Sequence, residues 1–163
     1  MKKLLMMIFV LMLAMSAVAE TAGFSLTPFA IALPADATAE PGENSVTYVR
    51  GGTRVVAMVI LRVPDGEPNE ALTRLMGQYD PAAVIGEALT LNEGYAGLTA
   101  VSADKLSPGV DQVTAMVLSG GDLLILSGYD LGGDEALVSQ LITDLLVSAR
   151  CGDAPLMPAP IPD

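Results

Sequence analysis

The amino-acid sequence predicts an α+β domain in which a largely antiparallel sheet of about six or seven strands carries two main helices. Glycine pairs separate apolar, β-type runs, as expected for tight hairpins. Two other segments repeat apolar residues at helical spacing. We expect the stretch 111–130 to form a hairpin around which the rest of the fold is built, because the apolar runs 113–118 and 123–126 flank Ser119-Gly120-Gly121-Asp122. The second run is apolar on both faces, so we expect other elements to cover both of its sides.

Residues 1–19 have the pattern of a secretory signal peptide. Lys2 and Lys3 precede an uncharged apolar run that ends in Ala17-Val18-Ala19, and small residues at an Ala-x-Ala site favour cleavage before Glu20. The run is shorter than a typical spanning helix, so we favour cleavage over the alternative of an uncleaved anchor. The expected location is therefore exported, secreted or extracytoplasmic, with no membrane span after signal removal.

The first half of the mature chain predicts a linker, a strand, a hairpin and a helix. Residues 20–27 form the linker, residues 28–34 between two prolines form an edge strand, and 35–44 form a loop. Strands 46–50 and 55–63 join at Gly51-Gly52, and the second is apolar on both faces, which indicates a central strand. A helix is expected from Glu67-Pro68 to Tyr79, with an apolar stripe along one side.

The second half predicts a four-stranded meander and a second helix. Strands 88–91 and 95–102 flank a loop at 92–94, a further loop covers 105–109, and the hairpin 113–126 follows. Residues 134–149 have a continuous apolar helical face, with acids at the positive end of the helix dipole. Residues 151–163 are rich in proline, so we expect a disordered or extended tail after a single domain over 28–150.

Charge and cysteine content limit the possible partners. The chain has 8 Lys and Arg against 19 Asp and Glu, and loss of Lys2 and Lys3 changes the formal net charge from −11 to −13. Such a chain repels nucleic acid and anionic lipid. Cys151 is the single cysteine, which leaves no intramolecular disulfide. It could be a reactive thiol or a dimer bridge, but we favour an inert or semi-buried residue.

The sequence marks no catalytic, cofactor-binding or metal-binding residues. It contains no histidine, which removes the commonest general base and metal ligand. A hydrolase could use two carboxylates instead, but no pair is marked. Residues 130–135 could loosely hold calcium, yet they lack alternating oxygen ligands, so helix capping is the better interpretation. We therefore expect no enzyme activity and no cofactor.

Three further sets of residues have alternative interpretations. The arginines of the first hairpin region either pair with acids or bind an anion, and both readings stay open: Arg50, Arg54 and Arg62. Tyrosines could mark a recognition surface, although ordinary sheet packing is favoured: Tyr48, Tyr95 and Tyr129. Methionines in apolar runs are interpreted as core filling: Met58, Met76 and Met116.

The exported context, the segment from Phe24-Ser25-Leu26 to Leu33-Pro34, the order of elements and the last helix ending in Ser148 resemble one family. It is the PsbP-like (Mog-type) α/β/α sandwich, which includes the DcrB-type bacterial envelope proteins, and the resemblance covers about residues 24–150. It implies an antiparallel sheet flanked by helices and a non-enzymatic role in binding or assembly. DcrB-type members are often lipoproteins, but this chain has no cysteine near the cleavage site.

The sequence thus predicts a secreted, non-catalytic domain that binds a protein or other macromolecular partner, or acts in cell-envelope assembly. Two alternatives are a carboxylate-dependent hydrolase and an extracytoplasmic carrier of a small ligand or cation. A hydrolase requires two acids facing each other in a deep pocket, and a carrier requires a cavity or converging oxygens. A binding domain requires a shallow exposed patch or an open strand edge. The identity of the partner and the oligomeric state are not specified.

Overall fold

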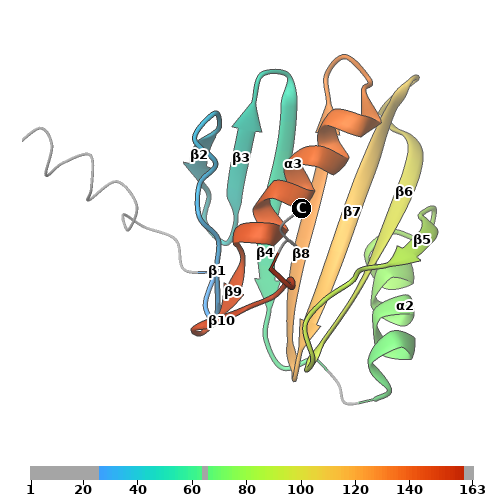
Figure 1. Ribbon diagram of the computed structural model, residues 1–163. Helices are drawn as coiled ribbons and strands as arrows, with labels where there is room; N and C mark the ends of the chain where they lie inside the picture. Colours follow the sequence, from blue (N-terminus) through green and yellow to red (C-terminus); the bar gives the residue numbers. More distant parts are fainter. Residues whose placement is uncertain (1–25, 64–65, 160–163) are drawn as a thin grey trace, which may run out of the picture.

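The computed structural model describes residues 26–63 and 66–159, and its main feature is a seven-stranded antiparallel sheet (Figure 1). The strand order is β2-β3-β4-β8-β7-β6-β5, and the strand bounds in that order are β2 Thr38–Pro41, β3 Val46–Arg50, β4 Thr53–Ile60, β8 Asp122–Asp130, β7 Val110–Ser119, β6 Tyr95–Ser107 and β5 Val84–Ala88. A small second sheet joins β1 (Phe29–Ala30), β9 (Arg150–Cys151) and β10 (Ala154–Pro155). The predicted signal peptide and its cleavage site lie outside the described residues.

The β7–β8 hairpin forms the middle of the large sheet. Its turn at Gly120 has φ +58°, which a residue without a Cβ adopts at no steric cost. Strand β8 is the fourth of seven, and its side chains alternate between two hydrophobic cores. Leu124 and Leu126 belong to one core, whereas Leu123 and Ile125 belong to the other. The prediction that this strand is covered on both sides is confirmed.

Two helices lie on opposite faces of the sheet. Helix α3 (Glu135–Ser148) packs over β8, β4 and β7, whereas α2 (Pro68–Tyr79) packs over β6 and β7. Figure 1 shows α3 crossing the near face and α2 beside β5 and β6. The α+β class and the α/β/α layering are therefore confirmed. Within residues 26–63 and 66–159, no helix is long and apolar enough to cross a membrane.

Both helices begin and end close to the predicted residues. Pro68 occupies the first turn of α2, where its missing N–H leaves no bond unmade. This helix buries Ala71, Leu72 and Met76, and ends where the Asp80 N–H donates to the Met76 carbonyl. The Asp134 carboxylate accepts from the backbone N–H of Ala136 and so caps α3.

Strand boundaries near the two sheet edges differ from the predictions. β2 lies inside the predicted loop 35–44, β5 overlaps the predicted strand 88–91 only at Ala88, and β6 extends into the predicted loop 105–109. Every residue of β2 and β5 is exposed. These edge strands therefore lack the alternation of buried and exposed residues that identifies a strand in a sequence.

The disordered tail expected over 151–163 requires correction for residues 151–157. Leu156 is fully buried in the core beneath α3, and its N–H donates to the Ala149 carbonyl. The Asn92 side chain donates to the carbonyls of Pro155 and Met157. One buried leucine and a set of backbone bonds thus hold a proline-rich segment in place. At the other end, Leu26 is also buried, so the domain extends beyond the expected bounds of 28–150.

Candidate functional site

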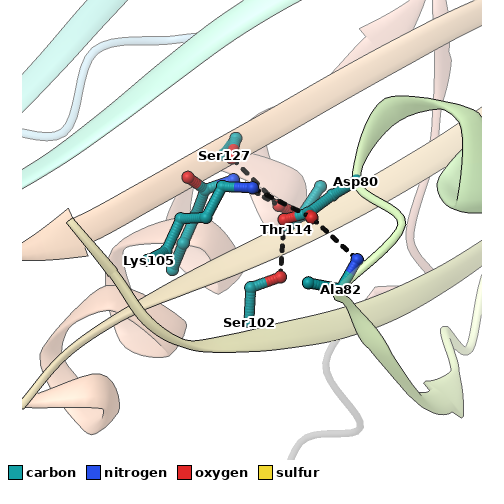
Figure 2. A network of polar contacts seen from close by, with 7 residues as sticks. Asp80, Ala82, Ser102, Lys105, Thr114 and Ser127 are labelled. Atoms are coloured by element: carbon teal, nitrogen blue, oxygen red, sulfur yellow. Dashed lines mark hydrogen bonds and ion pairs between the residues drawn. The ribbon is translucent and has the colours of Figure 1, made fainter.

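A buried carboxylate lies where α2 ends against β6. Asp80 is only 2% exposed. Its carboxylate accepts from Ser102 Oγ at 2.6 Å, Lys105 Nζ at 3.0 Å and the Ala82 N–H at 3.1 Å. Figure 2 shows these donors converging on Asp80 from β6 and from the segment after α2. The network therefore fixes the end of α2, and the start of β5, against the sheet.

These contacts keep Asp80 ionised. The Ser102 hydroxyl is the main cause of a lowered pKa, burial opposes it, and the Lys105 and Ala82 donors lower the pKa further. A general acid or base near neutral pH requires a pKa close to the working pH. A carboxylate with a lowered pKa and both oxygens occupied is suited to structural support, not to proton transfer.

Polar side chains continue from this network across the sheet. Thr114 on β7 and Ser127 on β8 face each other in register, with hydroxyl oxygens 2.9 Å apart. Gln112 Nε2 lies 3.5 Å from Thr114 Oγ1, and Gln112 pairs with Ser102 on β6. The Thr114 and Ser127 hydroxyl groups bond to each other, and these contacts include no carboxylate that could act as a general base. They satisfy buried polar atoms at the end of the core that α2 covers.

Asp130 forms a second buried carboxylate site, within the stretch 130–135. It accepts from Thr53 Oγ1 at 2.9 Å and from the N–H groups of Gly132 and Asp134. The Thr53 hydrogen bond is the main cause of its lowered pKa, against the opposing effect of burial. N–H and hydroxyl donors occupy its oxygens, which fits helix capping. Among the described residues, no three His, Cys, Asp or Glu side chains group closely enough for a metal ion.

The three arginines lie in different environments. Arg50 bridges Asp36 at 2.9 Å and Asp144 at 2.8 Å, and so ties the loop before β2 to α3. Arg54 pairs with Glu40 at 3.8 Å on the opposite face. Arg62 follows β4 with φ +60°, outside either ion pair. The structure does not gather the three side chains into one anion site.

The three tyrosines do not form a common surface. Tyr48 is buried beneath α3, where burial raises its pKa, and Tyr95 packs against the same core. Tyr129 projects to the other face of β8, since side chains alternate along a strand. Met76 and Met116 are fully buried in the core beneath α2, and Met58 packs at its margin.

Cys151 is half-buried on β9, opposite Phe29. Its sulfur lies 3.4 Å from the Ser119 hydroxyl oxygen. This position agrees with the semi-buried interpretation.

The sheet has one face that α2 covers only in part. We call the side chains that β3 and β4 direct toward the side of α2 the open face. They share a face because Thr47 pairs with Val56 and Val49 pairs with Arg54. The set comprises Thr47, Val49, Arg54, Val56, Met58 and Ile60. Most are half-buried, Ile60 is 46% exposed, and α2 makes its main contacts with β6 and β7 instead.

Sequence reasoning missed the open face. The apolar run of β4 predicted a central strand, and β4 does lie third among the seven strands. Its fully buried apolar residues, Val55 and Ala57, face the core beneath α3. The alternate residues, Val56 and Met58, remain half-buried. Arg54 in the same alternation was the one signal in the sequence of a partly solvated face.

The two sheet edges are also exposed, but both carry features that discourage strand pairing. Val84 and Ile85 on β5 are exposed, and the register shifts between Ile85 and Ala88. β2 contains Glu40 and ends at Pro41, which has no N–H to donate. Bulges, charges and prolines are common protections of edge strands. The open face is therefore the better candidate for a binding surface.

No protein-family model matches this chain, and no curated protein matches it. Solved structures do. The Ran-binding protein Mog1p of Saccharomyces cerevisiae is 13% identical with a TM-score of 0.52, over 77% of this chain and 91% of that one. Cyanobacterial PsbP of Synechocystis is 12% identical with a TM-score of 0.51, over 76% and 86%.

A third similar structure is LpqN of Mycobacterium tuberculosis, which is described as involved in cell envelope biogenesis. It is 17% identical with a TM-score of 0.50, over 80% of this chain and 83% of that one. These similarities show a Mog1/PsbP-like fold. They confirm the fold that the resemblance of the sequence to the PsbP-like family implies. At such low identity they establish the architecture alone.

Proposed function

We propose that this chain is an exported, non-catalytic domain that binds a macromolecular partner and acts in assembly of the cell envelope. The proposal rests on the open face, where half-buried valines and a methionine lie on a sheet surface away from the main contacts of both described helices. Exposed apolar surface rimmed by polar groups is typical of interaction sites. The proposed partner is a protein.

The buried acids support a binding role over catalysis. Asp80 and Asp130 are each occupied by their own donors, and each has a lowered pKa. A carboxylate-pair hydrolase requires one acid with a raised pKa beside a second carboxylate. Two of the proteins with this fold have related roles: Mog1p is named as a Ran-binding protein, and LpqN is described as involved in envelope biogenesis.

The export proposal is tested on the protein made by its own cells. Fractionation followed by N-terminal sequencing is expected to find the chain outside the cytoplasm, beginning at Glu20. A chain that begins at Met1, or that stays in the cytoplasmic fraction, would contradict export with signal removal.

The binding proposal is tested with the mature chain, residues 20–163, as immobilised bait. Extracytoplasmic extract is applied with and without excess untagged mature chain. A protein that is retained in near-stoichiometric yield and lost on competition is expected. The same preparation is assayed on glycans and peptides. Turnover that disappears in both Asp80→Asn and Asp130→Asn would refute the non-catalytic assignment.

A further inference from the structure

We infer that the open face binds a basic amphipathic helix of the partner protein, and that this helix lies beside α2. This inference rests on the proposed binding function. It specifies the surface, the secondary structure of the bound segment and the sign of its charge.

The space beside α2 fits one helix. On the other side of the sheet, α3 covers β8, β4 and β7, whereas α2 is placed mainly over β6 and β7. Three strand spacings of about 4.8 Å separate β8 from β2, so the strip that the helices at 68–79 and 135–148 leave uncovered on this face is roughly 14 Å wide. A helix with its side chains is about 10–12 Å across. One further helix would complete the layer that α2 begins.

The apolar part of this strip also matches a helix in length. Val56, Met58 and Ile60 alternate along β4 on the open face, and together they span about 13 Å at roughly 3.3 Å per residue. That length corresponds to about two and a half helical turns. Apolar residues at i, i+3, i+4 and i+7 of the partner would lie along it. Met58 is well suited to such a contact because its side chain adapts to irregular surfaces.

The charge of the chain favours a basic segment. The formal net charge is −11 for the whole sequence, so a basic partner is attracted and a second copy of this chain is repelled. Arg54 is the one charged member of the open face, and it pairs with Glu40 of β2 at 3.8 Å. The Glu40 side chain lies at the margin of this face and is 63% exposed. A partner lysine or arginine can reach that carboxylate at the rim. The edge strands favour an extended segment less, because of the β5 register shift and Pro41.

Site-specific photo-crosslinking in cells that naturally express the chain tests the contact. A photoreactive amino acid replaces Ile60 in the full chain. The matched control replaces Val147, which is 51% exposed on α3. Mass spectrometry of cross-linked peptides from Ile60 is expected to give one partner segment with apolar residues at helical spacing and lysines or arginines between them. The Val147 position is expected to give none.

Other outcomes overturn the inference in distinguishable ways. Cross-links from Ile60 to a second copy, to an extended segment or to an acidic segment would exclude the basic helix. Cross-links only from Val147, or capture of a partner with none from Ile60, would exclude this surface and leave the binding function standing. Failure of both the capture experiment and both cross-linking positions would remove the binding function itself.

Charge substitutions on the captured partner give an independent measurement. Ile60→Lys is expected to weaken binding by about tenfold or more, Ile60→Glu by clearly less, and Val147→Lys not at all. Circular dichroism verifies that each variant remains folded, since both positions are already exposed. Equal losses for Ile60→Lys and Ile60→Glu would contradict the basic character of the segment.

Discussion

At the scale of single residues, Asp80 is a buried carboxylate that joins three segments of the chain. It holds the end of α2, the start of β5 and part of β6 through hydroxyl, ammonium and backbone donors. Lys105 is 41% exposed, so its ion pair is screened by water and contributes little. Most of the stabilisation comes from the buried bond to Ser102, with a further contribution from the part-buried bond to the Ala82 N–H.

Asp80→Ala is therefore expected to lower the free energy of unfolding by about 2–4 kcal/mol, because it leaves a buried hydroxyl and an N–H without their acceptor. Lys105→Ala serves as the control and is expected to cost less than about 1 kcal/mol. Urea unfolding followed by circular dichroism measures both. Equal costs for the two variants would show that the ion pair, and not the buried bonds, dominates.

The same carboxylates predict how stability responds to acid. Asp80 and Asp130 have lowered pKa values in the folded chain, whereas an aspartate in an unfolded chain has a pKa of about 3.9. Their stabilising effect is thus complete above about pH 4 and is lost as the pH falls through the folded pKa values. The chain has no histidine, so no histidine titration adds a step between pH 5 and 8.

The measurement is urea unfolding from pH 7 down to pH 2.5. The wild-type chain should lose stability steeply below about pH 4. The double variant Asp80→Asn/Asp130→Asn should be less stable at pH 7 and show a shallower acid slope. An unchanged slope in the double variant would assign the acid response to other groups.

At the scale of elements, Gly128 allows both β4 and α3 to approach β8 closely. A Cβ at Gly128 would lie 2.5 Å from the Arg54 carbonyl oxygen and 2.6 Å from Val55 Cγ2, both on β4, and 3.1 Å from Val138 Cγ1 on α3. Gly77, in the interior of α2, has no neighbouring atom within 4 Å of such a Cβ. The two glycines are a matched pair with opposite expected effects.

Gly128→Ala is expected to destabilise the chain by about 1–3 kcal/mol through overpacking. Gly77→Ala is expected to stabilise it by up to about 1 kcal/mol, because alanine is the better helix former. Thermal unfolding of both variants gives the comparison. A neutral Gly128→Ala would mean that β4 and α3 both move away from β8 without cost.

The packing of the C-terminal segment depends on Leu156, which is fully buried between α3 and the loop around Asn92. Leu156→Ala should cost about 2–5 kcal/mol. The exposed Pro158 provides the control, and Pro158→Ala should change stability by less than about 0.5 kcal/mol. If Leu156→Ala behaves like the control, the segment does not pack on the domain in solution.

Elements with strong periodicity or turn chemistry could be predicted from the sequence. Examples are α2, α3 and the hairpin at Gly120-Gly121. The edge strands could not be predicted, because β2 and β5 expose every residue and so show no alternation of apolar and polar residues. They are strands only because they pair with β3 and β6. The packing of Leu156 was hidden by its proline-rich surroundings. The Asp80 site was missed because it joins residues 80, 102 and 105 through tertiary contacts alone.

At the scale of the whole molecule, two cores on the two faces of one sheet are covered unequally. Beneath α3, the core extends across β4, β8 and β7 and includes Leu26, which precedes β1, and Leu156, which follows β10. Beneath α2, the core is smaller and leaves β3 and β4 partly exposed. The proposed binding function follows from this asymmetry, and a partner helix would make the two layers alike.

Hydroxyl-radical footprinting of the mature chain, alone and with its captured partner, tests this account most directly. The partner is expected to slow the oxidation of Met58 and Ile60 on the open face and to leave the oxidation of Leu137 and Val147 on α3 unchanged. Protection confined to α3, or to Val84 and Ile85 on β5, would contradict it.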